Sequence, residues 1–347
     1  MRIWFNKHFQ GTFRHVNALV DTGLYEILVS HDKESVPVMQ SGNNNLSRDG
    51  VKKFKEEEFQ NIDGYVDWCL SFCESEKVGL FIPGKGKEQI EKRYNEFKKI
   101  GTKVLVASDA KTMFRLDQKD KFLKDVEGLV PTAPWRVFKT RKEFDKAWKE
   151  LGAGEVMDLC VKPVQGIYGS GFWKLTNEVS NMQLFTRLSL PVSQFLERVG
   201  EGLPEKWLLM QYCADDERSV DCVAHRGELI CAVIRRKRKN GVQEIEENQE
   251  IFNYTKTLVK KFKLSGLVNV QFKEHAGVMN ILEINPRASG GSGMAYLANA
   301  SLMPLAVEAF LNDGKVKTNA TPGYGMKIQS TQQYFVVQGE GDDSGSD

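Results

Sequence analysis

Three side chains that can bind a metal ion and a phosphoryl group stand at alternate positions in the segment 280–291, NILEINPRASGG. Glu283, Asn285 and Arg287 follow an apolar, strand-like run, and alternation along a strand directs all three to one face of a sheet. Carboxylate and carboxamide oxygens suit Mg²⁺, and a guanidinium can hold a phosphoryl group as its charge spreads during transfer. A polar sheet face that meets solvent is the alternative, which the Glu-x-Asn-Pro-Arg order followed by glycines disfavours.

The segment VNVQFKE (268–274) offers a fourth polar group. It is typical of a strand that pairs antiparallel with the strand before Pro286, so Gln271 can project onto the same polar face. The sequence therefore predicts a magnesium site formed by Gln271, Glu283 and Asn285, with Arg287 beside it.

A glycine-rich loop follows a strand in LCVKPVQGIYGSGFW (159–173). Lys162 lies at the strand end, and Gly169, Ser170 and Gly171 form a flexible turn before the next strand. Backbone N–H groups in such a loop can approach phosphate oxygens, and a lysine adds a compact positive charge. An ordinary hairpin with a surface lysine explains the same pattern.

The segment WLLMQYCADDERSVDCVA (207–224) passes from a hydrophobic strand through an acidic bend into a second strand. Edge N–H and C=O groups there can pair with a purine, and a nearby acid can take ribose hydroxyls. A polar turn between two strands is the alternative. GLFIPGKG (79–86) has Walker A spacing but carries Gly86 where that motif needs Ser or Thr, so we do not interpret it as a P-loop.

The elements that must position these groups fall into two regions with different patterns of strands and helices. Up to residue 108, strands and helices alternate, which favours a small parallel sheet covered by helices. Beyond it come a helix, a strand–helix–strand unit, the glycine-rich loop and then successive strands with turns at 226–227 and 275–277. We predict an α/β first domain over 1–108, α+β parts over 109–200 and 201–330, and a disordered acidic tail over 331–347.

Composition limits the function classes. The chain has 347 residues, 41% hydrophobic and 27% charged, with a net charge of +2, so bulk charge does not indicate a polyanionic partner. No run approaches the ~20 apolar residues of a membrane span, and the start lacks the apolar core of a signal peptide. Six scattered cysteines suit a reducing compartment. We expect a cytoplasmic protein that binds neither membrane nor nucleic acid.

Together these motifs resemble the ATP-grasp superfamily. VNVQF (268–272) and ILEINPRASGGSGMAYLA (281–298) look most like the large subunit of carbamoyl-phosphate synthase, with biotin carboxylase as a more distant relative. The resemblance covers about 110–312. It implies an N-terminal Rossmann-like domain followed by an ATP-grasp fold of two α+β subdomains. Only one ATP-grasp unit is present, so the chain is not a complete carbamoyl-phosphate synthase.

The resemblance also implies roles for individual residues. Glu283 would bridge two Mg²⁺ ions, Mn²⁺ being an alternative, with Gln271 on one ion and Asn285 on the other. Arg287, assisted by Arg235, would stabilise the transferring phosphoryl group. The ATP contacts would be Lys121 and Lys162 at the phosphates, Gly169, Ser170 and Gly171 in the lid, Met210, Gln211, Tyr212 and Cys213 at the adenine, and Glu217 at the ribose. Many members have an acid where this chain has Gln211.

Enzymes of this kind phosphorylate a carboxylate and then let an amine displace phosphate. The resemblance therefore implies an ATP-dependent carboxylate–amine ligase, with small-molecule carboxylate and amine substrates; a homodimer is compatible with it. A carbamate- or bicarbonate-phosphorylating enzyme and a non-catalytic ATP-binding regulatory protein are the alternatives. Candidate substrate contacts lie in the loop after the first strand and after Arg287: Asn6, Gln10, Gly11, Thr12, Ser289, Gly290 and Gly291.

Overall fold

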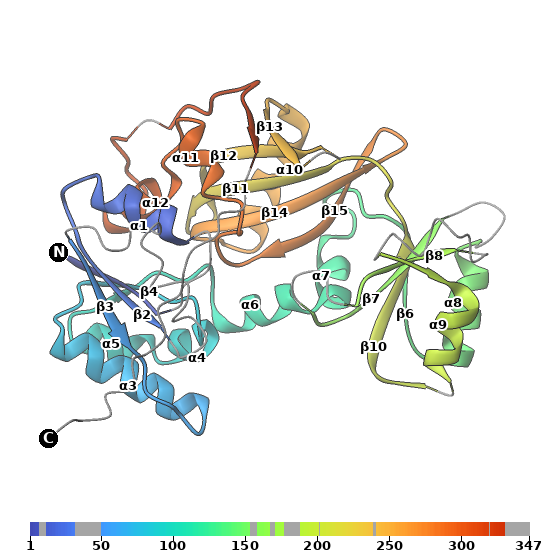
Figure 1. Cartoon of the computed structure of the whole chain (residues 1–347), viewed down its shortest axis with the longest axis horizontal. Helices are drawn as coiled ribbons and strands as arrows, with labels where there is room; N and C mark the ends of the chain where they lie inside the picture. Colours follow the sequence, from blue (N-terminus) through green and yellow to red (C-terminus); the bar gives the residue numbers. More distant parts are fainter. Residues whose placement is uncertain are drawn as a thin grey trace, which may run out of the picture. The chain divides into compact units, whose positions relative to one another are not determined.

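A parallel sheet forms the N-terminal part of the computed structural model (Figure 1), which describes residues 1–6, 12–31, 50–152, 158–166, 171–176, 188–200, 202–238, 241–318 and 320–329. Its strand order is β3-β2-β1-β4-β5, and every pair of neighbours is parallel. The α/β prediction for this part is confirmed. The strands are β1 (Arg2–Phe5), β2 (Glu26–His31), β3 (Val51–Lys55), β4 (Leu80–Ile82) and β5 (Lys103–Val104).

Alternation along β1 gives this sheet two covered faces. Trp4 packs with Phe81 and with helix α3, whereas Ile3 and Phe5 pack with α1 and α12 on the other side. The sequence pattern predicts one helix over 87–101, but the structure breaks it at Arg93, where φ is −102° and ψ is 18°. The helices of this part are α1 (Thr12–Val20), α3 (Ile62–Ser75), α4 (Lys87–Lys92) and α5 (Tyr94–Lys99).

A second sheet has the order β6-β10-β7-β8-β9. Thr140 and Glu143 form a capping box that starts α8, and the helix buries Phe144 against Phe138. The single helix predicted over 112–128 is two helices, because the chain leaves helical geometry at Gln118. The elements are α6 (Ala110–Asp117), α7 (Lys119–Val126), β6 (Trp135–Thr140), α8 (Arg141–Glu150), β7 (Leu159–Pro163), β8 (Trp173–Thr176), β9 (Ser189–Pro191), α9 (Val192–Val199) and β10 (Gly202–Gln211).

The third sheet has the order β15-β14-β11-β12-β13-β16. Its two predicted turns are present, with positive φ at Arg226 and Gly227 and again at Ala276 and Gly277. Strand β13 was not predicted, because it is short and its sequence VQEIE is largely polar. The elements are β11 (Glu217–His225), β12 (Glu228–Lys237), β13 (Val242–Glu246), α10 (Gln249–Lys261), β14 (Gly266–His275), β15 (Val278–Asn285), α11 (Met294–Leu297), α12 (Leu302–Leu311) and β16 (Lys327–Gln329).

By its internal contacts the chain divides into two units. The first comprises Met1–Met113, Ser219–Asn269 and Asn285–Asp347, and the second comprises Phe114–Arg218 and Val270–Ile284. The domain boundaries expected at 108, 200 and 330 stay predictions, and the acidic tail lies outside the described residues. No helix in the described ranges is long and apolar enough to span a membrane.

Candidate functional site

In the first unit, the chain turns tightly where β15 ends. The backbone N–H of Arg287 donates to the carbonyl of Asn285 at 2.7 Å. The guanidinium donates through Nη2 to Asn285 Oδ1 at 3.4 Å and through Nη1 to the carbonyl of Ala288 at 3.1 Å. The turn thus places the Arg287 side chain beside the carboxamide oxygen of Asn285, so these two predicted site residues lie together.

A buried ion pair supports the loop that follows. Arg235 and Asp221 have side chains only 1% and 0% exposed, and Arg235 Nε donates to Asp221 Oδ2 at 2.7 Å. The remaining guanidinium nitrogens donate to Gln243 Oε1, to Ser219 Oγ and, at 2.9 Å, to Ser289 Oγ. Ser289 Oγ in turn donates to Asp221 Oδ1. The guanidinium of Arg235 is therefore committed to protein groups that hold the loop, which favours a positioning role for it.

The same network reaches the predicted metal ligand Asn285. Asn269 donates from Nδ2 to Ser219 Oγ and to Asp221 Oδ1, both at 2.9 Å. Asn285 Nδ2 lies 3.4 Å from Asn269 Oδ1. These bonds orient the Asn285 carboxamide, so that its nitrogen meets Asn269 and its oxygen lies on the side of Arg287.

His15 fixes the far end of this loop. Ser292 Oγ donates to the carbonyl of Ser289 at 2.6 Å and lies 2.7 Å from His15 Nε2. Because the hydroxyl proton is used, Nε2 must carry the proton donated to Ser292. Burial lowers the pKa of His15 to about 4; nearby Asp221 opposes this shift and Arg14 adds to it. The imidazole is therefore neutral at pH 7.

Close approach explains a glycine in the loop. A Cβ at Gly291 would lie 2.5 Å from Arg235 Nη1, whereas a Cβ at Gly290 would meet no atom within 4 Å. Gly291, a predicted substrate contact, thus makes room for Arg235, and Gly290 is exposed.

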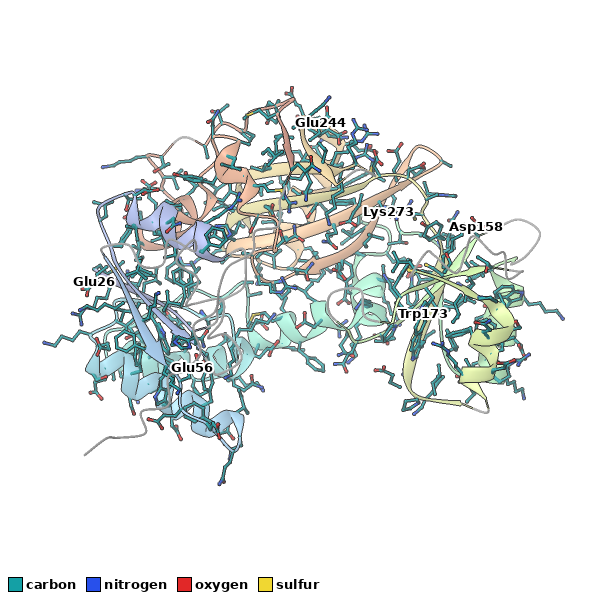
Figure 2. The ribbon with its side chains drawn as sticks, in the orientation of Figure 1. Glu26, Glu56, Asp158, Trp173, Glu244 and Lys273 are labelled. Atoms are coloured by element: carbon teal, nitrogen blue, oxygen red, sulfur yellow. The ribbon has the colours of Figure 1, made fainter. Side chains whose placement is uncertain are left out.

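Asn6 has its polar atoms engaged by the protein. Its Oδ1 accepts from the backbone N–H groups of Gly84 and Lys85, and its Nδ2 donates to Tyr65 Oη and to the carbonyl of Lys85. Lys85 also pairs at 3.1 Å with buried Glu56, which Figure 2 labels. Asn6 therefore shapes the loop after β4. Gln10 and Gly11 lie outside the described residues, as does the side chain of Thr12.

Charged groups gather around Lys119 in the second unit. Its N–H donates to the carbonyl of Val164 at 3.1 Å, and its Nζ donates to the carbonyl of Gly166 at 2.9 Å. Burial lowers the pKa of Lys119; Glu283 raises this pKa and Lys162 lowers it further. Two lysines and the predicted metal-ligating carboxylate thus share one electrostatic neighbourhood.

Lys121, the predicted phosphate contact, lies two positions after Lys119 in α7. Lys121 Nζ lies 5.0 Å from the centre of the Phe114 ring. The two lysines are two positions apart in the first turn of α7, so they point about 200° apart around the helix. Which of the two lysines lies beside the segment 164–166 depends on the orientation of α7. The residue types alone did not show that orientation.

The predicted adenine segment ends β10. Met210 and Cys213 are buried in a small cluster with Ala133 and Cys160. The backbone N–H groups of Gln211 and Tyr212 donate to the carbonyls of Pro134 and Asp158.

The ring of Tyr212 lies 4.7 Å from Lys174 Nζ and 5.1 Å from Lys273 Nζ (Lys273 is labelled in Figure 2). Burial raises the pKa of the Cys160 thiol to about 12, which argues against a cysteine nucleophile here. Glu217 begins β11.

The predicted lid is described only at its end. Gly171 has a φ of +75°, and a Cβ there would lie 2.9 Å from Pro163, so both backbone conformation and space require glycine. Gly169 and Ser170 lie outside the described residues. Phe172 packs near Tyr212, and Trp173 begins β8.

The donor set suits magnesium rather than a softer metal. Across the described ranges no three His, Cys, Asp or Glu side chains gather as a metal site. The predicted ligands Gln271, Glu283 and Asn285 are half-buried and offer one carboxylate and two carboxamide oxygens. Mg²⁺ accepts such a set when phosphate oxygens and water complete its shell. The chemistry of these side chains therefore fits the expected ion.

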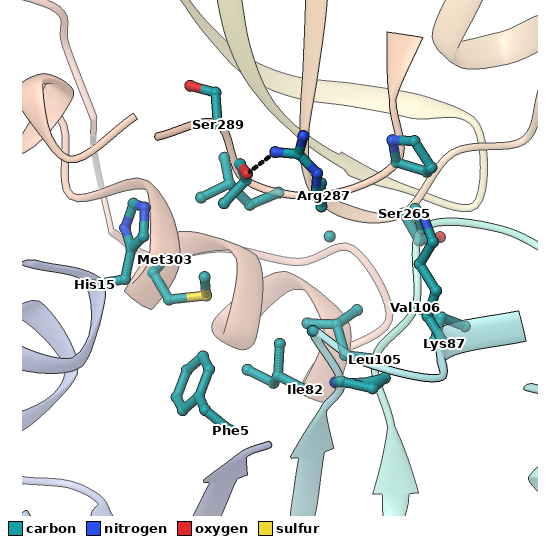
Figure 3. A pocket seen from close by; sticks show the side chains of 17 residues that line it. Phe5, His15, Ile82, Lys87, Leu105, Val106, Ser265, Arg287, Ser289 and Met303 are labelled. Atoms are coloured by element: carbon teal, nitrogen blue, oxygen red, sulfur yellow. Dashed lines mark hydrogen bonds between the residues drawn. The ribbon is translucent and has the colours of Figure 1, made fainter. Parts of the chain in front are cut away.

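Arg287 also lines a pocket of the first unit, with His15, Lys87 and Ser289 (Figure 3). The opposite wall comes from the ends of β1 and β4 and the segment after β5, through Phe5, Ile82 and Leu105. The carboxyl ends of parallel strands are where α/β sheets bind ligands.

Known proteins are similar to this chain in sequence. Residues 204–334 match a family model described as "ATP-grasp in the biosynthetic pathway with Ter operon". The carbamoyl phosphate synthase large chain of Clostridium acetobutylicum is 22% identical over 291 residues, which cover 79% of this chain and 25% of that protein. The chain spans a quarter or less of the length of the curated relatives it matches.

Solved structures share the fold at low identity. The ADP complex of an N5-carboxyaminoimidazole ribonucleotide synthetase has a TM-score of 0.64 and 15% identity, covering 90% of this chain and 77% of that one. An L-amino acid ligase from Bacillus licheniformis has a TM-score of 0.59 and 12% identity, covering 89% and 73%. Residues 204–334 are thus similar to an ATP-grasp family, and the chain shares the fold of these solved ligase structures.

Proposed function

We propose that the chain is an ATP-dependent ligase that joins a small carboxylate to an amine and releases ADP and phosphate. The oxygen of the carboxylate attacks the γ-phosphorus of ATP, and the bond from that phosphorus to the β,γ-bridging oxygen breaks, which gives ADP and an acylphosphate. The amine nitrogen then attacks the acyl carbon, loses a proton and expels inorganic phosphate. Both substrates are small molecules, and the proposed compartment is the cytoplasm.

The position of Arg287 carries this proposal. Its side chain lies beside the Asn285 carboxamide and lines a pocket at the carboxyl ends of parallel strands. A guanidinium there can hold a phosphoryl group and orient an incoming carboxylate by charge-assisted hydrogen bonds. No covalent enzyme intermediate is needed, so rate enhancement would come from positioning and charge neutralisation.

The other residues have supporting roles in the proposal. Lys119 and Lys162 would neutralise ATP phosphates, and the segment Met210–Cys213 would hold the adenine, with Glu217 at the ribose. Glu283, Asn285 and Gln271 would hold two Mg²⁺ ions, which neutralise phosphate charge when bound. Members of the superfamily use ATP and Mg²⁺.

ADP release tests the reaction. We expect release that depends on a carboxylate, and hydroxylamine in place of the amine should trap the acylphosphate as a hydroxamate. Release that requires bicarbonate and no other acid would instead support the carbamate-type alternative, which the similarity to carbamoyl phosphate synthase favours. Tight ATP binding without ADP in every mixture would identify a non-catalytic ATP-binding protein.

Two substitutions test the site. Glu283→Ala should abolish ADP release while circular dichroism shows an intact fold. Arg287→Ala should keep ATP binding and lower turnover by roughly 10²–10³-fold, the usual effect of removing one charge-stabilising group. Glu228→Ala, at an exposed position on β12, is the matched control. ADP release at the wild-type rate by the Glu283 variant would refute the metal assignment.

A further inference from the structure

The pocket beside Arg287 is small and belongs to the first unit alone. Its cavity volume is about 90 Å³, and its lining comes from the carboxyl ends of the N-terminal sheet, the segment 286–289 and α12 (Figure 3). A cavity needs roughly 10–15 Å³ to hold one water, so this space admits a group of a few non-hydrogen atoms and not a nucleotide. The occupant that fills it is therefore a small molecule or one end of a larger one.

One wall of the pocket is apolar. Phe5, Ile82, Leu105 and Met303 line it, and Phe5, Leu105 and Met303 are almost fully buried. Figure 3 shows these side chains gathered on the side away from Arg287. Such a wall gains from contact with hydrocarbon and loses from contact with an unpaired polar group.

The charges of the pocket have one sign. Lys87 and Arg287 are the charged side chains among the 17 described lining residues, and both are basic. His15 is neutral near pH 7 because burial lowers its pKa to about 4. No described lining residue is Asp or Glu, so the described lining offers an anion two cations and offers an ammonium group no carboxylate.

These properties discriminate among acids. Bicarbonate has no hydrocarbon part and would set only polar oxygens against the apolar wall. A dicarboxylate would press a second charge against that wall, and an α-amino acid would bring an ammonium group without an acidic partner from the described lining. A monocarboxylate with a short branched hydrocarbon tail satisfies both walls.

We propose that this pocket binds the acceptor as a small aliphatic monocarboxylate, with the carboxylate toward Arg287 and Lys87 and the tail against Phe5, Ile82 and Met303. This assignment rests on the proposed ligase function, since it names the acid that would be phosphorylated. The loop held by Arg235 and His15 fixes the polar wall through Ser289 and Ser292, so the carboxylate end is the more rigid. Met303 can adapt its shape to the tail.

Binding and turnover are measured separately on the full chain. Saturation-transfer NMR with isovalerate, without ATP, reports binding in the pocket. ADP release with hydroxylamine compares isovalerate, succinate, leucine and bicarbonate. We expect an isovalerate signal in the wild type and an isovalerate kcat/KM at least tenfold above those of the other three acids.

Two variants assign the effect to the pocket. Ile82→Ala should lower kcat/KM for isovalerate about tenfold and favour hexanoate, because each methylene contact is worth about tenfold or more. Lys87→Met should weaken isovalerate binding by a similar factor, while Lys92→Met, an exposed lysine of the same helix, should not.

The outcomes separate the two proposals. If succinate or leucine is the best substrate, the ligase proposal stands and the assignment of the pocket is overturned. If only bicarbonate supports ADP release, both proposals are overturned in favour of the carbamate-type alternative. If no acid supports ADP release but isovalerate binds and Lys87→Met abolishes the signal, the pocket is correct and the ligase proposal fails. Absence of both binding and isovalerate turnover overturns the assignment.

Discussion

Two polar regions of this chain handle buried charge in opposite ways. Around Arg235 in the first unit, the charges are almost fully buried, and the guanidinium donates hydrogen bonds to Asp221, Ser219, Gln243 and Ser289. Around Lys119 in the second unit, half-buried Lys119 and Lys162 share their neighbourhood with the carboxylates of Glu283, Asp117 and Glu205. In one region the charge is fully buried and hydrogen-bonded within the protein, and in the other two neighbouring lysines are half-buried.

This difference distinguishes residues that hold the protein's own loops in place from residues that can bind a ligand. A buried pair whose polar atoms are satisfied fixes geometry, and removing one partner leaves an uncompensated charge. Two half-buried lysines that lie near one another interact favourably with an added anion. We therefore expect substitutions near Arg235 to change stability most, and substitutions near Lys119 to change nucleotide affinity most.

The largest effect is expected for Asp221→Ala. It leaves the guanidinium of Arg235 buried without its carboxylate, which should lower the free energy of unfolding by about 3–5 kcal/mol. Urea denaturation measures this loss, with Lys119→Met as the contrasting variant. Equal stability of the two variants would erase the contrast between the regions.

His15 is expected to make the stability of the folded protein depend on pH. Its pKa is about 4 in the folded protein, against the 6.5 that is usual for an exposed histidine. The unfolded chain therefore binds the proton more tightly, so stability is retained above pH 6.5 and is lost as pH falls toward 4. The loss attributable to His15 is on the order of 3 kcal/mol.

The His15→Gln variant isolates this contribution. Glutamine can still donate to Ser292 but does not titrate, so its unfolding free energy should fall less between pH 7 and pH 4.5 than that of the wild type. The same pH slope in both proteins would show that His15 does not carry the effect.

A smaller loss is expected for Gly291→Ala. The added Cβ would lie 2.5 Å from Arg235 Nη1, and overpacking of this kind costs about 1–3 kcal/mol. Gly290→Ala is the matched control, because a Cβ there meets no atom within 4 Å. Thermal or urea unfolding of the two variants checks the difference, and equal stability would contradict the close packing of this loop.

The smallest effect separates two lysines of α7. Lys119→Met should weaken ATP binding about tenfold, or ~1.4 kcal/mol, by removing one charge-assisted contact, whereas Lys121→Met should change it by less than about twofold. Isothermal titration with ATP measures both. A larger loss for Lys121→Met would restore the sequence-based assignment.

The sequence predicted the elements whose patterns are local. The parallel sheet, the turns at 226–227 and 275–277 and the strand ending at Asn285 follow from alternating apolar residues and glycine. Short β13 lacked such a signal, because its pairing partners β12 and β16 define it rather than its own residues VQEIE. The breaks at Arg93 and Gln118 were missed because those residues have ordinary helix propensity.

The candidate site likewise has features that the sequence predicts and features that it does not. The closeness of Asn285 and Arg287 follows from their spacing, so it was predictable. The partners of Arg235 could not be predicted, because Asp221, Gln243 and Ser289 come from β11, β13 and the loop after β15. The pocket walls were hidden for the same reason, since Phe5 and Met303 are almost 300 residues apart.

The order of the chain has a consequence for synthesis on the ribosome. The first unit interrupts at Met113 and resumes at Ser219, so 218 − 113 = 105 residues of the second unit are made in between. At roughly 5–20 residues per second, this takes about 5–20 seconds. During that time Ile3, Phe5 and Val29 of the nascent sheet lack the core partners that are made later, such as Val223, Leu267 and Leu305. The face of the sheet that carries these three side chains is therefore where a chaperone would bind.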